Sequence, residues 1–336
     1  MKTTLTLARW LGPWADPKRA PDVAITDDSV DGMRVRLFHP PGRTRRVFLI
    51  AQGLHYAGAD DPRLDRFCRI LARAGHLVIA PYIPAYLALT PNAQAKREFL
   101  AAFDALPRWT DQQPVVFSIS FGSLLAFTLA AERPEKIERL VCFGGYSDFR
   151  EMMKFCLTGE IPNGRQGTRD PLNQPVVLMN LMHLIPCADR PALIEGWRRH
   201  VQATWGRPEL KVGTAFIAIA ESIAPSLPEP VRELFLIGVG ARPGAAPLAL
   251  EALDRFDDRD LDPRPYLPKI RCRVDLVHGL DDDVIPYEHS QALGALLPTS
   301  RVHLTGMYGH SGASKGGLST AVKELSTMLR VLFAMS

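Results

Sequence analysis

Short apolar runs of strand length recur along the chain and are separated by segments whose apolar residues have a helical spacing. In Pro62–Ala74, for example, Leu64, Phe67, Ile70 and Leu71 fall on one face of a helix. Strand runs alternating with helical segments predict an α/β fold, with a mostly parallel sheet covered by helices. The predicted strands are Met33–Phe38, Val47–Ala51, His76–Ala80, Val115–Ile119, Ile137–Phe143, Cys272–His278 and Arg301–Leu304, and the predicted crossover helices are Pro62–Ala74, Asn92–Leu106 and Phe121–Arg133.

This rhythm breaks after Phe143. Residues 147–268 contain many prolines and no clear strand, but they include the apolar helical stretches Gln174–Ile185, Pro191–Trp205 and Val212–Ile223. The strand–helix pattern resumes at Arg271 and closes with an amphipathic helix near Lys315–Phe333. We therefore predict a core formed by residues 1–146 and 271–336, with residues 147–270 as an inserted α-helical cap.

Composition excludes several classes of function. The chain has 336 residues, is 46% hydrophobic and 23% charged, and carries a net charge of +4 from 40 basic and 36 acidic residues, as expected of a soluble globular protein. Its basic residues are scattered, which argues against a nucleic-acid partner. The 5 cysteines include no C-x-x-C pair, so neither a disulfide framework nor a zinc site is predicted, and we expect a reducing, cytoplasmic location.

The N-terminal segment MKTTLTLARWLGPW is a poor signal peptide, because Arg9 and the Gly12–Pro13 pair interrupt a short apolar stretch. We expect it to dock against the core or to fray. The alternative is contact with a membrane surface as a short amphipathic segment, which nothing else in the sequence supports.

The strongest sign of chemistry is the segment PVVFSISFGS at residues 114–123, where an apolar strand runs into Ser120 and then into a helix. A serine on such a sharp turn needs small residues two positions to either side, and Ser118 and Gly122 meet this need. Ser118 and Ser123 are weaker candidates, since the former lies within the strand and the latter within the helix. The segment resembles the nucleophile elbow of the α/β-hydrolase family, G-x-S-x-G, with Ser118 in place of the first glycine.

The resemblance extends to LVHGLDDDVIP at residues 276–286, which is similar to the family segment that bears the acid of a catalytic triad. It implies that Asp282 is the acid, with Asp281 or Asp283 as alternatives one residue away; the aspartates that are not the acid would cap a helix near Tyr287. Asp148 is a rival acid, although we favour a role for it as the N-cap of the first cap helix. His278 is interpreted as a hydrogen-bonding residue at a strand end.

A third similar segment, TGMYGHSG at residues 305–312, places His310 in a glycine-rich loop after the last predicted strand. The order Ser120, Asp282, His310 is the order that the family requires. His303 lies within the preceding strand and is interpreted as structural.

A serine nucleophile also needs donors for the oxyanion of its tetrahedral intermediate. The resemblance implies the backbone N–H of Phe121 as one donor and a residue in the loop AQGLHYAG (51–58) as the other, for which Leu54 is the candidate. The H-G-G-G motif of many lipases and esterases is absent. For His55 in this loop, packing is favoured over contact with a substrate.

The resemblance therefore implies a serine hydrolase that cleaves a carboxylic ester through an acyl-enzyme, with no metal and no cofactor. The same triad would serve a thioesterase, an amidase, a carbon–carbon bond hydrolase or an acyltransferase, and a non-catalytic binding protein is the alternative from another class. Apolar residues of the cap suggest a small, hydrophobic acyl substrate, although we favour a role for them in the core of the cap itself. These residues are Met179, Met182, Leu184, Phe216 and Ile217.

Overall fold

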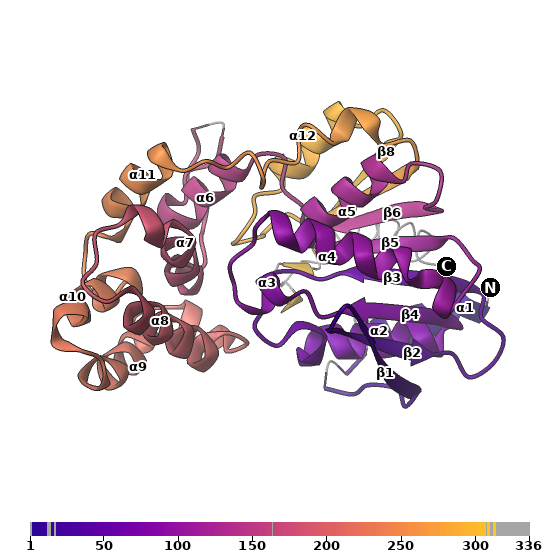
Figure 1. Ribbon diagram of the computed structural model, residues 1–336, viewed down its shortest axis with the longest axis horizontal. Helices are drawn as coiled ribbons and strands as arrows, with labels where there is room; N and C mark the ends of the chain where they lie inside the picture. The colour runs from indigo at the N-terminus through magenta and orange to yellow at the C-terminus, as the bar shows by residue number, and fades with distance from the viewer. Residues whose placement is uncertain are drawn as a thin grey trace.

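The centre of the molecule is an eight-stranded sheet with the strand order β1-β2-β4-β3-β5-β6-β7-β8 (Figure 1). A computed structural model describes residues 2–11, 15–16, 18–162, 164–306, 308–309 and 312–313 of the chain. The strands of this sheet are β1 (Ala24–Val30), β2 (Met33–His39), β3 (Arg46–Ala51), β4 (His76–Pro81), β5 (Pro114–Ile119), β6 (Arg139–Phe143), β7 (Arg273–Gly279) and β8 (Ser300–Thr305). A separate pair joins β9 (Tyr308–Gly309) to β10 (Gly312–Ala313).

The strands from β4 to β8 run parallel, and only the β1–β2 and β2–β4 pairs of this sheet are antiparallel. The predicted mostly parallel sheet is therefore confirmed, and β1 is the strand that the sequence pattern did not predict. Because parallel strands end at the same edge, the loops after β3, β5 and β7 meet there. Ligands of open α/β sheets bind at this edge, and Leu54, Ser120, Phe121 and Asp282 lie in these loops.

Helices cover both faces of the sheet. Side chains alternate between the faces, so that Val116 packs with α4 and α5, whereas its neighbour Phe117 packs on the side of α1 and α2. Leu7 of α1 is fully buried in this second cluster, which confirms the predicted docking of the N-terminal segment. The helices of the core are α1 (Lys2–Leu11), α2 (Pro62–Arg73), α3 (Pro84–Leu87), α4 (Ala93–Asp104), α5 (Gly122–Glu132) and α12 (Glu288–Leu296). Within the described residues, no helix combines the length and apolar character that crossing a membrane requires.

Between β6 and β7 the chain forms a set of helices at one side of the sheet, which we call the inserted helices (Figure 1). They have a core of their own, in which Trp197 and Phe235 are fully buried. A Cβ atom on Gly238 would lie 2.4 Å from the ring of Trp197, so this packing requires glycine. The inserted helices are α6 (Phe149–Thr158), α7 (Gln174–Leu181), α8 (Arg190–Thr204), α9 (Ala215–Ile223), α10 (Glu229–Gly238) and α11 (Ala245–Arg255).

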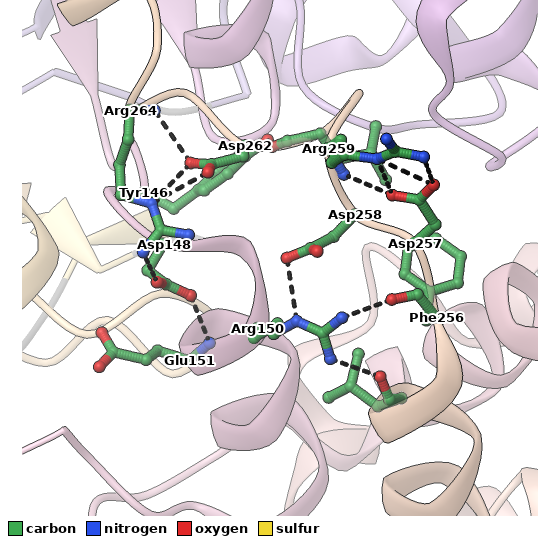
Figure 2. Close-up of polar contacts among 12 residues, drawn as sticks. Tyr146, Asp148, Arg150, Glu151, Phe256, Asp257, Asp258, Arg259, Asp262 and Arg264 are labelled. Atoms are coloured by element: carbon green, nitrogen blue, oxygen red, sulfur yellow. Dashed lines mark hydrogen bonds and ion pairs between the residues drawn. The ribbon is translucent and has the colours of Figure 1, made fainter.

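The chain enters and leaves the inserted helices through two segments that lie side by side, residues 146–151 and 256–264, which we call the stem (Figure 2). The hydroxyl of Tyr146 donates to the carbonyl of Leu261 at 2.7 Å. Arg150 donates to the carbonyls of Leu253 and Phe256, and its Nε lies 3.2 Å from a carboxylate oxygen of Asp258. These contacts tie the two ends of the insertion to each other.

Candidate active site

Ser120 lies on a sharp turn between β5 and α5. Its backbone φ is +52°, in the left-handed region that residues other than glycine rarely adopt. Holding a serine there costs on the order of 1–3 kcal/mol. Its N–H donates to the carbonyl of Phe143 at 2.8 Å, which holds the turn against the end of β6. The structure therefore gives Ser120 the strained backbone that the elbow sequence predicts.

The residues around Ser120 must be small, because the turn packs against the loop that follows β3. A Cβ on Gly122 would lie 2.0 Å from the carbonyl oxygen of Ala51, a distance that no side chain tolerates. A Cβ on Gly53 would lie 3.2 Å from the carbonyl oxygen of Ile119. Leu54, the residue after Gly53, is thereby placed at the same pocket as Ser120.

The two proposed oxyanion donors flank the serine. Leu54, Ser120 and Phe121 all line one pocket. Among the hydrogen bonds of the described residues, none is donated by the N–H of Leu54 or of Phe121. Two backbone donors that the protein itself does not use, beside a serine, are what stabilisation of an oxyanion requires.

His55, which follows Leu54, packs within its own loop. Its Nδ1 accepts the N–H of Ala57 at 3.1 Å, and its Nε2 lies 3.2 Å from a carboxylate oxygen of Asp61. The ring stacks on Tyr56 and contacts Trp205. Burial lowers the pKa of His55 below its usual value, against the opposing effect of Asp61. The packing role predicted for this histidine is confirmed.

Asp282 is buried in the loop after β7 and is held by several donors. Its Oδ1 accepts the N–H groups of Val284 at 2.9 Å and of Ile285 at 2.8 Å, and its Oδ2 lies 3.3 Å from Nε2 of His278. These contacts fix the orientation of the carboxylate at the edge of the sheet where Ser120 lies.

His278 has the role of a hydrogen-bonding residue at a strand end, as predicted. Its Nε2 lies 2.8 Å from the carbonyl of Ile285 and its Nδ1 lies 2.7 Å from the hydroxyl of Ser290. Because a carbonyl can only accept, Nε2 carries a hydrogen.

The neighbouring aspartates differ from what the sequence predicted. Neither Asp281 nor Asp283 caps α12, because its N-cap residue is Tyr287 and no side chain makes a capping hydrogen bond there. Asp281 is exposed, and Asp283 turns toward the inserted helices, where it forms an ion pair with Lys211 at 2.6 Å. The helix begins at Glu288, five residues beyond Asp283, which is too far for its carboxylate to cap.

Asp148 caps α6, as we favoured from the sequence. Its Oδ1 accepts the N–H of Glu151 at 3.0 Å, and its other oxygen lies 2.7 Å from Arg264 (Figure 2). Its carboxylate thus has structural partners in the stem.

His310, the predicted base, lies outside the described residues. Its role as the base therefore stays a prediction. His303 of β8 lies 3.0 Å from Asp275 through its Nε2 and is buried, which confirms the structural role expected of it.

The pocket beside Ser120 holds about 520 Å³ of empty space, part of it open to solvent, and its walls are mainly apolar. Residues of the core and of the inserted helices both line the pocket. Those of the inserted helices include Met152, Met153, Val176 and Val177. The lining consists of Leu54, Pro91, Ser120, Phe121, Phe149, Met152, Met153, Cys156, Asn173, Val176, Val177, Asn180, Trp205 and Val284.

The cap residues that the sequence suggested as substrate contacts do not line this pocket. Met179, Met182 and Phe216 are buried among the inserted helices instead, in agreement with the role we favoured for them. The contacts that sequence reasoning missed include Phe149, Met152, Met153 and Cys156 of α6. The two adjacent methionines near the start of the insertion are the sequence feature that would have indicated this wall.

The chain matches no family model and no curated protein sequence. Among solved structures it is similar to a serine hydrolase from the polyaromatic-hydrocarbon-degrading bacterium Cycloclasticus zankles, with 14% identity and a TM-score of 0.51 over 93% of this chain and 98% of that one. It is also similar to Est1E from Butyrivibrio proteoclasticus, with 13% identity and a TM-score of 0.49 over 92% of this chain and 99% of that one. The order of its strands and the first of these similarities show that the chain has the α/β-hydrolase fold.

Proposed function

We propose that the protein is a serine hydrolase that cleaves carboxylic esters with an apolar acyl group. One observation supports this most directly: Ser120 has the strained backbone of a nucleophile elbow and opens onto an apolar pocket, beside the N–H groups of Leu54 and Phe121. A serine at φ +52° is retained only where its surroundings enforce it, and such strain is concentrated at functional sites.

The proposed reaction uses Ser120, His310 and Asp282. His310 removes the proton from Oγ of Ser120, which attacks the ester carbonyl carbon, and Asp282 orients the imidazole and stabilises its charged form. The N–H groups of Leu54 and Phe121 donate to the oxyanion. His310 then protonates the leaving alcohol, and water hydrolyses the acyl-enzyme through the same base.

Residues 147–270 would act as a cap that shapes the substrate site. Support comes from the pocket itself, whose lining includes residues of α6 and α7 and Trp205 as well as Ser120. The apolar lining fits a small, hydrophobic acyl group. All five cysteines are free thiols, which supports a cytoplasmic location.

Labelling with a fluorophosphonate probe tests the nucleophile. We expect wild-type protein to react, Ser120→Ala to lose all labelling, and Asp282→Asn to react about 10³- to 10⁴-fold more slowly, because the imidazole would lose its orienting carboxylate. Ser123→Ala is the matched control, since Ser123 is a buried serine within α5, and it should label at the wild-type rate.

Hydrolysis of p-nitrophenyl esters of increasing chain length then measures how long an acyl chain the pocket accepts. Thioesters, amides, carbon–carbon substrates and added acceptor alcohols separate an esterase from the other enzymes that use the same triad. Absence of both labelling and turnover in wild-type protein would contradict the proposal and favour a binding protein instead.

A further inference from the structure

Lys211 connects the inserted helices to the loop that bears Asp282. It ends the short helical turn η5 (Pro208–Lys211) between α8 and α9. Its Nζ lies 2.8 Å from Oδ2 of Asp170 and 2.6 Å from Oδ2 of Asp283. One ammonium group therefore contacts a carboxylate of the insertion and a carboxylate of the core.

A backbone hydrogen bond reinforces this connection. The N–H of Asp170 donates to the carbonyl of Asp283 at 2.7 Å. The other carboxylate oxygen of Asp170 accepts the N–H of Leu172 at 2.9 Å, which fixes the side chain that Lys211 contacts. Asp170 is thus held in place on both its backbone and its side chain.

The ion pairs are shielded from water. The side chain of Lys211 is 17% exposed and that of Asp170 is 7% exposed. Burial opposes the charge of the lysine, but the two carboxylates outweigh it and raise the pKa of Lys211 above its usual value. Partly buried charges of this kind are costly to leave unpaired, so removing the lysine would favour separation of the two segments.

The loop fastened in this way is the turn that orients the predicted acid. Asp283 is the residue after Asp282, and Asp282 in turn accepts the N–H groups of Val284 and Ile285. A further contact from the insertion reaches the same turn, since Sγ of Cys156 lies 3.3 Å from the carbonyl of Val284. Residues 280–286, which we call the acid turn, are therefore held by the core through Asp282 and by the insertion through Lys211.

We infer that Lys211 is a positioning residue that fastens the acid turn to the inserted helices, so that the orientation of Asp282 depends on those helices being docked. The part of this inference that concerns catalysis rests on the proposed function. The mechanical part, that Lys211 restrains the acid turn, does not.

The experiment combines hydrogen exchange with kinetics on the full chain. Lys211→Met removes the charge and keeps much of the side-chain length, whereas Lys211→Arg keeps the charge. Lys154→Met is the matched control, because Lys154 is an exposed lysine of α6 in the same insertion. Backbone exchange is followed in peptides that cover residues 279–290, and kcat and KM are measured for a p-nitrophenyl ester at a temperature where circular dichroism shows each variant folded.

In Lys211→Met we expect faster exchange in the acid turn and a kcat lowered about 10- to 100-fold, since small displacements of a catalytic group have effects of this size. KM should change much less, Lys211→Arg should restore most of kcat, and Lys154→Met should match wild type in both measurements.

Unchanged exchange in the acid turn of Lys211→Met would overturn the inference, whatever happens to kcat. Faster exchange with an unchanged kcat would overturn the positioning role and leave only a structural contact. If wild-type protein fails to label at Ser120, the proposed function fails, and the exchange measurement still decides whether Lys211 restrains the acid turn.

Discussion

Ser120 occupies a conformation that stability alone would not select. Its φ of +52° is one that glycine adopts freely and that costs other residues about 1 kcal/mol or more. The hydrogen bond from its N–H to Phe143 and the packing of Gly122 against Ala51 enforce it. The strain thus arises from the backbone conformation at position 120 and does not depend on the serine hydroxyl.

We therefore predict different stabilities for two variants that lack the Ser120 hydroxyl. Ser120→Gly should raise the free energy of unfolding by about 1 kcal/mol, because glycine relieves the strain, whereas Ser120→Ala should leave it close to the wild-type value. Denaturant unfolding of the three proteins measures the difference. Equal stability of the glycine and alanine variants would contradict the assignment of strain to this residue.

At the scale of single residues, the sequence predicted the backbone geometry of Ser120 better than the surroundings of Asp282. Ser120 could be predicted because a strand, a small residue on each side and a helix leave one geometry open. The roles within Asp281–Asp283 could not, because three consecutive carboxylates look alike in sequence. Their partners distinguish them. Asp282 accepts the N–H groups of Val284 and Ile285, whereas Asp283 pairs with Lys211, and tertiary structure sets these contacts.

Among the elements, the stem is held by polar contacts that differ greatly in exposure. Arg150 donates to two backbone carbonyls and pairs with Asp258, whereas Arg259 pairs with Asp257 on the surface and is 88% exposed (Figure 2). Hydrogen bonds from a charged, partly buried donor to backbone carbonyls contribute more than exposed ion pairs do.

Arg150→Met should consequently lower the free energy of unfolding by about 1–3 kcal/mol and speed proteolysis within residues 256–264. Arg259→Met is the matched control and should leave both unchanged. Thermal unfolding and limited proteolysis of the two variants provide the measurement. If both variants were cleaved at the same rate as wild type, Arg150 would have no role in holding the stem.

The elements themselves were mostly predictable, and the one strand missed in the eight-stranded sheet, β1, has a physical reason. β1 has the sequence AITDDSV, and it lies at the edge of the sheet with most of its residues partly or fully exposed, so it lacks the apolar run that marked the others. The sequence feature that indicates β1 is the Asp31–Gly32 pair after it. Both residues have positive φ, as expected of the turn of an Asp-Gly hairpin.

For the whole molecule, buried histidines make stability depend on pH. Burial lowers the pKa of His76, His200 and His289 from the usual 6.5 to about 4 in each case. The backbone N–H of Ser147 donates to Nδ1 of His289 at 3.3 Å, so the folded protein uses this ring nitrogen in its unprotonated form.

Between pH 6.5 and 4 the unfolded chain binds protons at these histidines that the folded chain does not. Stability should therefore be fully present above pH 6.5 and fall as the pH drops toward 4, by up to roughly 3 kcal/mol for each histidine. His289→Gln should make the dependence of the melting temperature on pH shallower in this window. His183→Gln, at an exposed position, should leave the curve unchanged.

The architecture of the whole molecule followed from periodicity, because parallel strands covered on both faces appear as apolar runs between helical segments. The contacts between the core and the insertion did not follow from periodicity. Asp170, Lys211 and Asp283 are distant in sequence and carry no local pattern, so their meeting depends on how the inserted helices dock.

The stem also affects how this protein can change over evolutionary time. Because Tyr146 contacts Leu261 directly, the two ends of a segment of more than a hundred residues are already joined. Lengthening or replacing a loop whose ends are fixed costs little, since the entropy of closure grows only with the logarithm of its length. The insertion supplies much of the pocket wall while Ser120 belongs to the core, so replacement of the insertion would change the lining of the pocket and leave Ser120 in place.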